Sequence, residues 1–423
     1  MDSTDFFNDV TEYSSATIAD ISSLSNNNAD SGYRSGKISF IVIGAGLIGP
    51  RHAAHIVARP DCELFAIVDH SAKGPKVAEQ FDSLLFKNLS EMFSYCEYNN
   101  VPYPTAAIIA TPNHTHVKLG IELASKGIHL LVEKPLASNT QDCMTLISYC
   151  NHKNVKLLVG HHRRFNPYII ATKNNLDKLG RLVAMQGTWT LCKPPSYFLD
   201  KPWRSSVELG GGTLLINLIH DLDLLQYLLG PIEKVYAELL TKQRTDRFDE
   251  QSFASNELVD EGAVLTLKFA NGCCGTFICS DNVTSPFSFE AGTGENPTVP
   301  FNDEVSGFYR IFGSHGTISV PDLKLYHQYE LLPSPSPSPN YKDDSPIHRF
   351  REKPKPFDLQ LDHFVNLIRG DETEVKCTGE DAVRALLCIE AVTKSIETGM
   401  PQYVESIDNI KVDVDMLNDF MET

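Results

Sequence analysis

The chain has 423 residues, of which 42% are hydrophobic, so it is long enough to bury two cores and predicts two folded domains. Its formal net charge of −17 is concentrated at the ends, because residues 1–36 and 405–423 together hold 12 acidic and two basic residues. The middle of the chain is therefore only mildly acidic, which excludes the basic surface of a nucleic-acid-binding protein.

Cysteine usage and the N-terminal composition indicate the compartment. The ten cysteines include no Cys-x-x-Cys pair, which is typical neither of a zinc site nor of a disulfide framework. The first residues lack the basic and apolar regions of a secretory signal, and no apolar run approaches the roughly 20 residues of a membrane span. We expect reduced thiols, no metal site, no membrane contact and a cytoplasmic location, with the nucleus as the alternative.

Residues 1–36 are poor in apolar side chains and rich in Ser, Asn and Asp, which predicts a disordered tail. Order begins with a β-rich run over 38–43, followed by the glycine-rich segment 44–49 and a predicted helix over 52–57. Strand, glycine turn and helix follow one another in the order that a dinucleotide-binding site requires.

Each glycine of that turn has a separate expected role. Gly44 makes the tight turn, Gly46 lets the backbone approach a pyrophosphate, and Gly49 lets the helix pack on the strand. Leu47 and Ile48 complete the cofactor-binding turn. The alternative, a structural glycine turn in a similar sheet, is much weaker because strand, glycines and helix occur together.

A second predicted strand over 64–68 ends in Asp69, 20 residues after Gly49. At that distance a carboxylate binds the ribose hydroxyls of the cofactor. Asp69 favours NAD because a carboxylate repels the extra phosphate of NADP, although Lys73 could accommodate that phosphate.

The alternation of strands and helices continues to Val159. The expected helices cover 77–81, 89–95, 117–126 and 140–153, and the expected strands cover 106–110, 128–132 and 156–159. This pattern predicts that residues 37–160 form a Rossmann domain, an α/β fold with a doubly wound parallel sheet.

Two of these strands end in polar segments. The strand over 106–110 leads into Thr111-Pro112-Asn113 and then into His114 and His116. Thr111, Pro112 and Asn113 are all expected at the cofactor. These histidines either shape the turn or contact the cofactor or substrate, and the residues alone do not decide between the two.

The strand over 128–132 ends in Glu133, Lys134 and Pro135. A charged pair at the carboxyl end of a buried parallel strand lies where open α/β sheets bind their ligands. Pro135 restricts the backbone of Lys134 and so sets the direction of the ammonium group. We expect Lys134 to act as a proton donor and Glu133 to lie beside the cofactor.

In the second half, Gly210-Gly211-Gly212 precede a predicted helix over 213–229. Asn217 and His220 are three residues apart on that helix and so share a face. Both are expensive to bury without partners. Two interpretations have equal weight at this point: a functional histidine, or a core histidine bonded to Asp223.

The remaining pattern is one of alternating strands separated by turns, which predicts an antiparallel sheet. Strands are expected over 235–240, 263–269, 274–279, 309–312 and 316–320, and helices over 359–368 and 380–397. A polar loop over 241–261 and a loop over 285–300 interrupt the sheet, and the second of these is expected to cap the active site. A Pro-Ser repeat over 333–339 and an acidic tail over 405–423 are predicted to be unstructured.

Several segments occur together over about residues 38–404: the glycine turn, the Thr-Pro-Asn turn, Glu133-Lys134-Pro135, the segment 160–167 and the segment 210–220. In this combination the chain resembles the glucose–fructose oxidoreductase, inositol dehydrogenase and rhizopine catabolism (Gfo/Idh/MocA) family. The resemblance implies an α/β substrate domain over 161–404, whose large, mostly antiparallel sheet also forms a homo-oligomer interface. Residues 216–221 and 292–297 are similar to the fungal quinate-utilisation oxidoreductase branch.

The resemblance also implies an activity. An NAD(P)-dependent oxidoreductase would transfer hydride to or from a sugar, polyol or cyclitol, with Lys134 and His220 as the acid/base pair. Family members carry an aspartate four residues before the histidine, and here that position is Ile216. Either Lys134 and His220 suffice while Asn217 orients the substrate, or Asp221 substitutes, or catalysis is weakened.

Other polar residues are expected at the substrate. Arg164 and Asn166 follow the first domain, and Lys193, Trp203 and Arg204 precede the glycines. Lysine and arginine together form a clamp for a carboxylate, which fits a quinate-like acid better than a neutral polyol. The alternative is that these are solvated loop charges.

Two functions from different classes fit these observations. The first is the enzyme, and the second is a non-catalytic NAD(P)-binding sensor of carbohydrate metabolism on the same fold. Lys134 and His220 favour the enzyme, whereas Ile216 and the acidic tails are compatible with the sensor.

Overall fold

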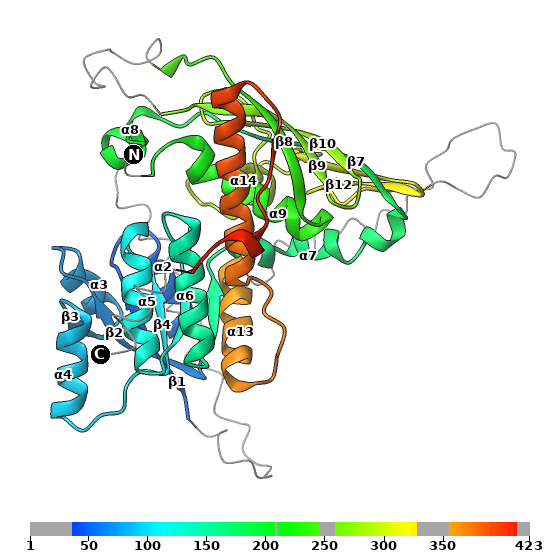
Figure 1. Cartoon of the computed structure of the whole chain (residues 1–423). Helices are drawn as coiled ribbons and strands as arrows, with labels where there is room; N and C mark the ends of the chain where they lie inside the picture. The colour runs from blue at the N-terminus through cyan, green and yellow to red at the C-terminus, as the bar shows by residue number, and fades with distance from the viewer. Residues whose placement is uncertain (1–35, 208–209, 245–258, 328–354, 413–423) are drawn as a thin grey trace, which may run out of the picture.

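The computed structural model describes residues 36–207, 210–244, 259–327 and 355–412. The tail predicted over 1–36, the loop over 241–261, the Pro-Ser repeat over 333–339 and the acidic tail from 405 lie wholly or largely outside these ranges. The described residues form two β-sheets, each packed against its own buried core. In Figure 1 the sheet that contains β1 lies below the sheet that contains β7.

The first sheet has six parallel strands in the order β3-β2-β1-β4-β5-β6, which confirms the predicted doubly wound sheet. The order reverses between β1 and β4, the switch point at which such sheets bind ligands. The strands are β1 (Ile38–Ile43), β2 (Cys62–Val68), β3 (Leu84–Phe86), β4 (Ala106–Ile109), β5 (His129–Val132) and β6 (Leu157–Val159). The helices between them are α2 (Gly49–Val57), α3 (Gly74–Gln80), α4 (Leu89–Tyr98), α5 (His116–Ser125) and α6 (Thr140–His152).

The second sheet has eight strands in the order β13-β12-β11-β7-β10-β9-β8-β14, and only β7 and β10 pair in parallel. The predicted, mostly antiparallel sheet is therefore confirmed. Its strands are β7 (Leu182–Thr190), β8 (Ile232–Leu239), β9 (Gly262–Phe269), β10 (Cys274–Ser280), β11 (Tyr309–Gly313), β12 (Gly316–Val320), β13 (Leu325–His327) and β14 (Gln402–Tyr403).

The sequence does not predict β7, although this strand lies in the middle of the second sheet. Gly187 interrupts its apolar pattern because the ring of Phe277 occupies the space beside it. A Cβ atom on Gly187 would lie 2.5 Å from that ring. The residue that weakens the strand signal is thus required by the packing of the sheet.

Two C-terminal helices return to the first core. α13 (Pro356–Arg369) packs Phe364 against Phe40 of β1, with ring centroids 6.1 Å apart. Figure 1 shows α14 (Gly379–Thr398) as one long helix that reaches both parts of the molecule. It contributes Val383, Leu386 and Leu387 to the first core, and Cys388, Ile389 and Val392 to the second. The predicted boundary at residue 160 therefore separates the sheets but not the cores.

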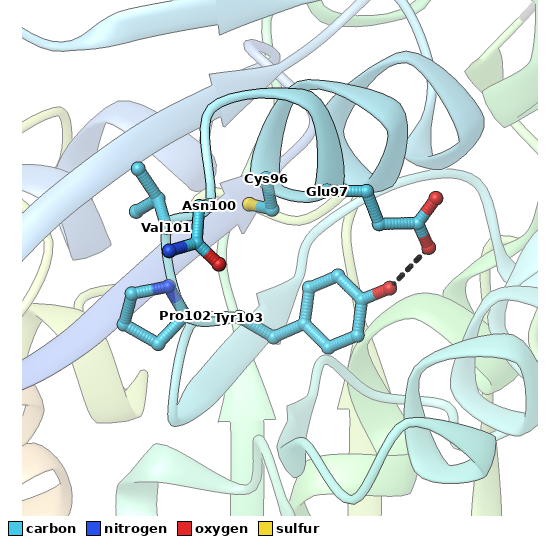
Figure 2. A pocket seen from close by; sticks show the side chains of 6 residues that line it. All are labelled: Cys96, Glu97, Asn100, Val101, Pro102 and Tyr103. Carbon is cyan, nitrogen blue, oxygen red and sulfur yellow. Dashed lines mark hydrogen bonds between the residues drawn. The ribbon is translucent and has the colours of Figure 1, made fainter.

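A shallow hollow lies beyond the end of α4, at the edge of the first sheet (Figure 2). It is lined by Cys96, Glu97, Asn100, Val101, Pro102 and Tyr103. The Tyr103 hydroxyl donates a hydrogen bond to Glu97 Oε1 at 2.6 Å. None of the predicted site residues lines this hollow. Among the described helices, none has the length and apolar character needed to cross a bilayer.

Candidate active site

The turn between β1 and α2 has the shape of a diphosphate cradle. Gly44 has a φ of +103°, and a Cβ on Gly49 would lie 1.8 Å from the Gly44 carbonyl oxygen, so both positions need glycine. By contrast, no atom lies within 4 Å of the position that a Cβ on Gly46 would take. Leu47 is 55% exposed, and no side chain caps the first turn of α2 at Ile48. Open space beside uncapped helix amides fits a bound diphosphate.

Asp69 lies beside this turn, at the end of β2. Its Oδ2 accepts a hydrogen bond from the Ala45 amide at 2.6 Å, and its Oδ1 accepts one from the Ser71 amide at 2.6 Å. Burial by itself raises the pKa of Asp69, but the bonds from Ser71 and Ala45 outweigh it, so the net pKa is lowered. Asp69 is therefore ionised at neutral pH, which suits ribose hydroxyls and disfavours an additional phosphate.

The Thr111-Pro112-Asn113 turn follows β4 at the same edge of the sheet. A Cβ on Gly210 would lie 3.6 Å from Asn113 Nδ2, so this turn meets the glycine segment of the second domain. All three residues are accessible: Pro112 is exposed, and Thr111 and Asn113 are half-buried. Their contact with the cofactor stays a prediction.

The surroundings of His116 show how its ring is held. The ring is fully buried, with Nδ1 3.0 Å from the Pro135 carbonyl oxygen and Nε2 2.9 Å from the Thr111 carbonyl oxygen. Both ring nitrogens thus face backbone carbonyl oxygens, and the neutral ring can donate a hydrogen bond to one of them. His116 lies between the Thr111 turn and the segment that carries Lys134, which supports the turn-shaping interpretation, and its contact with the cofactor stays a prediction.

Glu133 is also held within the protein. Its Oε1 lies 2.8 Å from His52 Nε2, and its Oε2 accepts a hydrogen bond from the Lys134 amide at 3.3 Å. Burial raises the pKa of Glu133, but the bond to His52 and the nearby positive charges lower it overall. Its carboxylate fixes the backbone next to Lys134, and a direct contact with the cofactor stays a prediction.

Lys134 connects the two domains through its side chain. Its Nζ donates a hydrogen bond to the backbone carbonyl of Ile216 at 3.1 Å. Burial, together with the charges of Arg163 and Lys193, lowers its pKa from 10.5 to about 8, although Glu133 acts in the opposite direction. A lysine with this pKa is protonated at neutral pH and can still exchange its proton readily.

The segment that receives Lys134 is not a regular α-helix. The predicted helix over 213–229 divides into η5 (Leu214–Leu218), a π-helical turn, and α9 (Ile219–Leu229). Asp260 holds the start of the turn, because its Oδ1 accepts a hydrogen bond from the Leu214 amide at 3.0 Å. The turn carries Ile216, whose carbonyl oxygen bonds Lys134 at the position where an aspartate was expected from the family resemblance. Single π-turns often occur at functional sites.

His220 begins the α-helical part and is buried, with 7% of its surface exposed. Among the described residues, its Nδ1 has no hydrogen-bond partner, and its ring centroid lies 5.7 Å from that of His162 and 6.2 Å from that of His161. Burial, followed by the charges of Lys134 and Arg163, lowers the pKa of His220 well below 6.5. His220 is therefore neutral at pH 7 and able to accept a proton. Asp223 bonds Arg164, so the interpretation of His220 as a histidine satisfied by Asp223 is wrong.

Asn217 and Lys193 form a second contact on the same turn. Lys193 Nζ donates a hydrogen bond to Asn217 Oδ1 at 2.6 Å and lies 3.2 Å from Asp281 Oδ2. Lys193 is only 8% exposed, so it is not a solvated loop charge. Two lysines from different domains therefore meet two adjacent residues, Ile216 and Asn217.

Asp221 is fully buried and accepts a hydrogen bond from the Tyr309 hydroxyl. Burial raises its pKa to about 7, although Arg163 acts in the opposite direction. Because its bonds are made away from Lys134, Asp221 does not take the place of the missing aspartate in binding that lysine. Direct contact of Asp221 with substrate stays a prediction.

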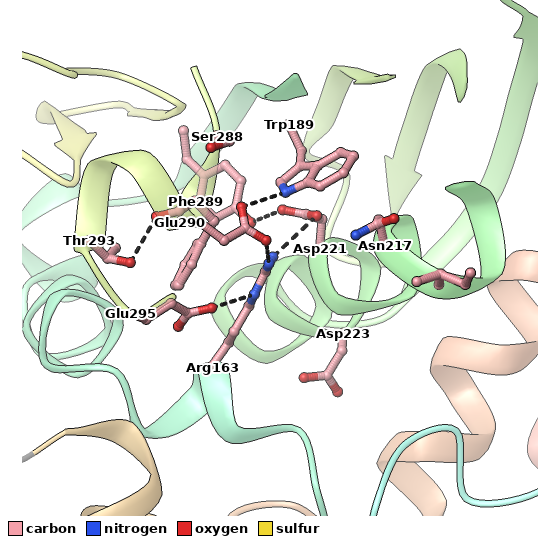
Figure 3. Close-up of polar contacts among 12 residues, drawn as sticks. Arg163, Trp189, Asn217, Asp221, Asp223, Ser288, Phe289, Glu290, Thr293 and Glu295 are labelled. Carbon is pink, nitrogen blue, oxygen red and sulfur yellow. Dashed lines mark hydrogen bonds and ion pairs between the residues drawn. The ribbon is translucent and has the colours of Figure 1, made fainter. Parts of the chain in front are cut away.

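Figure 3 shows a network around Arg163 whose partners the sequence did not indicate. Arg163 Nη2 donates to Glu290 Oε1 at 2.5 Å, and its Nε donates to Glu295 Oε1 at 3.1 Å. The indole of Trp189 also donates to Glu290, at 2.8 Å. Glu290 and Glu295 belong to the loop over 285–300, which includes the short helix α11 (Phe289–Thr293). Arg163 thus holds this loop in place, and the role of the loop as a cap on the active site stays a prediction.

Two predicted substrate residues have partners within the protein. Arg164 uses all its guanidinium nitrogens within the protein: Nε and Nη2 bond Asp223, and Nη1 bonds Asp381 and the Lys376 carbonyl oxygen. Asn166 caps the helix α7 (Pro167–Lys173), because its Oδ1 accepts a hydrogen bond from the Tyr168 amide at 3.0 Å. Both side chains thus have structural roles, and their contact with the substrate stays a prediction.

Trp203 and Arg204 lie in the turn η4 (Pro202–Ser205), and their substrate contact stays a prediction. Trp203 is 38% exposed. The guanidinium carbon of Arg204 lies 3.7 Å from the centroid of the Tyr197 ring, and the Arg204 carbonyl oxygen accepts a hydrogen bond from the Gly212 amide at 3.2 Å. Arg204 is thus attached to the glycine segment that precedes the π-turn.

The chain matches two models of one oxidoreductase family. The model described as the NAD-binding Rossmann fold of the oxidoreductase family matches residues 38–161, and the model of its C-terminal alpha/beta domain matches residues 173–405. Scyllo-inositol 2-dehydrogenase (NAD(+)) of Bacillus subtilis (strain 168) is 26% identical over 372 residues, which are 85% of this chain and 94% of that protein. Myo-inositol 2-dehydrogenase of Thermotoga maritima is 26% identical over 361 residues, or 84% and 95% of the two chains.

Solved structures show the same fold. The WlbA dehydrogenase from Bordetella pertussis in complex with NADH and UDP-GlcNAcA has a TM-score of 0.67 at 24% identity, over 88% of this chain and 99% of that one. Scyllo-inositol dehydrogenase from Lactobacillus casei has a TM-score of 0.66 at 18% identity, over 88% and 100%. Because the two family models together span most of residues 38–405, this chain belongs to the Gfo/Idh/MocA family: it is an oxidoreductase with an NAD-binding Rossmann domain.

Proposed function

We propose that this oxidoreductase transfers hydride between NAD and the CH–OH carbon of a sugar, polyol or cyclitol, with Lys134 and His220 as its acid/base pair. The observation that supports this most directly is the bond from Lys134 to Ile216, in the turn that leads to His220. A buried lysine and a buried histidine, both with lowered pKa values, are thereby brought to one place from two domains.

NAD, when bound, accepts or donates the hydride. The residues that would hold it fit its chemistry: the open backbone at Gly46 and the uncapped start of α2 for the diphosphate, and the ionised Asp69 for the ribose hydroxyls. The Thr111-Pro112-Asn113 turn would line the same edge of the sheet, between the nucleotide domain and Gly210.

The protein residues have to move one proton. In the oxidative direction, neutral His220 accepts the proton of the substrate hydroxyl, while the Lys134 ammonium donates a hydrogen bond to the same oxygen. In the reductive direction, Lys134 polarises the carbonyl oxygen and a proton returns to it as the alcohol forms. The carbonyl of Ile216 orients the ammonium, a task for which a backbone oxygen serves in place of a carboxylate.

The substrate class rests on the relatives and on the charge of the site. Two relatives are named as dehydrogenases of scyllo- and myo-inositol, which supports a cyclitol. A narrower alternative is a quinate-like hydroxy acid, which is also a polyhydroxylated ring but carries a carboxylate. Lys134 and Lys193, the buried lysines that bond Ile216 and Asn217, support that alternative.

The test follows nicotinamide absorbance with purified protein, NAD or NADP, and a panel of inositols, polyols, aldoses, quinate and shikimate. We expect turnover of at least one ring alcohol, with NAD preferred because Asp69 is ionised. Turnover that survives in both Lys134→Met and His220→Asn would contradict the assigned acid/base pair.

One observation favours a second candidate, a non-catalytic NAD(P)-binding sensor. Ile216 leaves the acid/base set without the carboxylate expected from the family resemblance. A sensor would bind NADH and a sugar or cyclitol, as measured by calorimetry, but would not change nicotinamide absorbance with any member of the panel.

We also propose that copies of the chain associate through the open face of the second sheet. Val264 on β9 and Ile278 on β10 are 40% and 43% exposed, and the two residues pair directly on that face. An exposed apolar sheet face is typical of a protein interface. Light scattering should show an oligomer that Ile278→Lys dissociates, and a monomeric wild type would contradict the proposal.

A further inference from the structure

Three cationic side chains gather at the entry to the helix that carries His220, and each donates to a neutral oxygen. The bonds run from Lys134 Nζ to the Ile216 carbonyl (3.1 Å), from Lys193 Nζ to Asn217 Oδ1 (2.6 Å) and from Arg204 Nη1 to the Tyr197 carbonyl (2.8 Å). A neutral acceptor satisfies a hydrogen bond but does not balance a charge. This region therefore has positive charge available for an anionic ligand.

The proposed acid/base reaction does not use Lys193 and Arg204, and Lys193 is the more buried of these two cations. Its other partner is Asp281, at 3.2 Å, but that carboxylate also bonds Arg244 at 2.6 Å. One carboxylate is thus shared by two buried cations. Asp260, nearby, is bonded to the Leu214 amide, and burial raises its pKa to about 6, so it offers weak compensation.

Arg204 and Lys193 face the same aromatic ring. The ring centroid of Tyr197 lies 4.3 Å from Lys193 Nζ and 3.7 Å from the guanidinium carbon of Arg204. The Nε of Arg204 is buried and has no hydrogen-bond partner among the described residues. A buried donor without an acceptor is costly unless a ligand supplies the acceptor.

Lys193 also lies near Lys134, because the two side chains bond adjacent residues, Ile216 and Asn217. The charge of Lys193 contributes to the lowered pKa of Lys134, after burial. A group held by Lys193 would therefore lie beside the carbon that reacts at Lys134, within one small ring substrate.

We propose that Lys193, with Arg204 beside it, binds a carboxylate of the substrate, so that this enzyme acts on a polyhydroxylated acid and not on a neutral polyol. The inference rests on the proposed function and narrows its substrate class. Lys193 is here a specificity-determining residue: it anchors the acid group, while Lys134 and His220 move the proton.

The experiment compares hydroxy acids (quinate and shikimate) with neutral ring alcohols (myo- and scyllo-inositol) in wild type, Lys193→Met and Lys193→Arg. Wild type should show the higher kcat/KM for an acid. Lys193→Met should raise KM for that acid by about 10- to 100-fold, the loss expected for one hydrogen bond to a charged group, with a smaller change in kcat. Lys193→Arg should restore much of the acid preference because it keeps the charge. Lys201→Met, on the exposed part of the same segment, is the matched control.

The outcomes separate the inference from the proposed function. If no compound on the panel is oxidised or reduced by a protein that binds NADH, the proposed function fails. If neutral cyclitols react as well as acids, or if Lys193→Met weakens both classes equally, only the carboxylate site fails. Should Lys193→Met not fold, Arg204→Gln and the wild-type preference decide: the site is overturned if Arg204→Gln leaves the KM for the acid unchanged.

Discussion

Two buried cationic centres flank the helix that carries His220, and they are built in opposite ways. Arg163 bonds Glu290 and Glu295 and lies 3.6 Å from Asp221, so its charge is more than matched. Lys134 and Lys193 instead bond the neutral oxygens of the π-turn, and the one carboxylate near Lys193, Asp281, is shared with Arg244. Since an unmatched buried charge is costly, we infer that the first centre stabilises the fold, and we propose that the second keeps its charge for a ligand. The difference shows how one helix can serve structure on one side and reaction on the other.

Removing the amine of Lys134 should have the largest effect on this contrast. Lys134→Met is expected to lower kcat by about 10²- to 10⁴-fold, the range for a general acid or base, without loss of stability. Steady-state kinetics and thermal unfolding measure the two properties. Lys118→Met, exposed on α5, is the control, and an active Lys134→Met would remove Lys134 from the chemistry.

Arg163→Met should show the reverse behaviour. It leaves Glu290 and Glu295 without their cation, so we expect a loss of about 3–5 kcal/mol in the free energy of unfolding. Urea denaturation measures this loss, and Arg310→Met, at an exposed position of β11, provides the control. A stability equal to that of wild type would mean that the matched centre is not structural.

The pH dependence of carbonyl reduction should sharpen the role of Lys134. Because its pKa is lowered to about 8, the protonated form is lost above that pH, and the rate should fall about tenfold per pH unit. Lys134→Arg should abolish this fall, since arginine stays charged. A pH profile that is flat to pH 10 in wild type would assign the proton transfer to another group.

Asp221 should make the stability of the fold depend on pH. Its folded-state pKa of about 7 exceeds the 3.8 of the free side chain, so the folded state binds the proton more tightly. The stability present below pH 4 is therefore lost as the pH rises towards 7, by at most about 1.4 kcal/mol per pH unit. Asp221→Asn should reduce this slope in denaturation curves taken between pH 5 and 8. An unchanged slope would place the titration elsewhere.

The nucleotide half of the site could be predicted because its signals are local. The spacing of Gly44, Gly46 and Gly49 follows from contacts within one turn, and Asp69 follows from the next strand. The position of Lys134 at the end of β5 was likewise predictable from a buried run of residues.

The substrate half depends on contacts between distant residues. Arg163 and Glu290 are 127 residues apart, and Lys193 meets Asn217 across 24 residues and an irregular segment, so no periodicity reveals either pair. The positive charge of Arg164 suggested a ligand, yet Asp223 and Asp381 balance that charge. The π-turn was unpredictable because its residues have an ordinary helical pattern.

The shared helices have a consequence for biosynthesis. Ribosomes complete the six strands of the first sheet before residue 160, but Phe364 of α13 and Leu386 of α14, which close its core, are made some 200 residues later. During that interval the nucleotide domain has an uncovered apolar surface and has to wait for the last quarter of the chain. A nonsense mutation anywhere before α14 therefore deprives both domains of core residues, and not only the domain in which the chain stops.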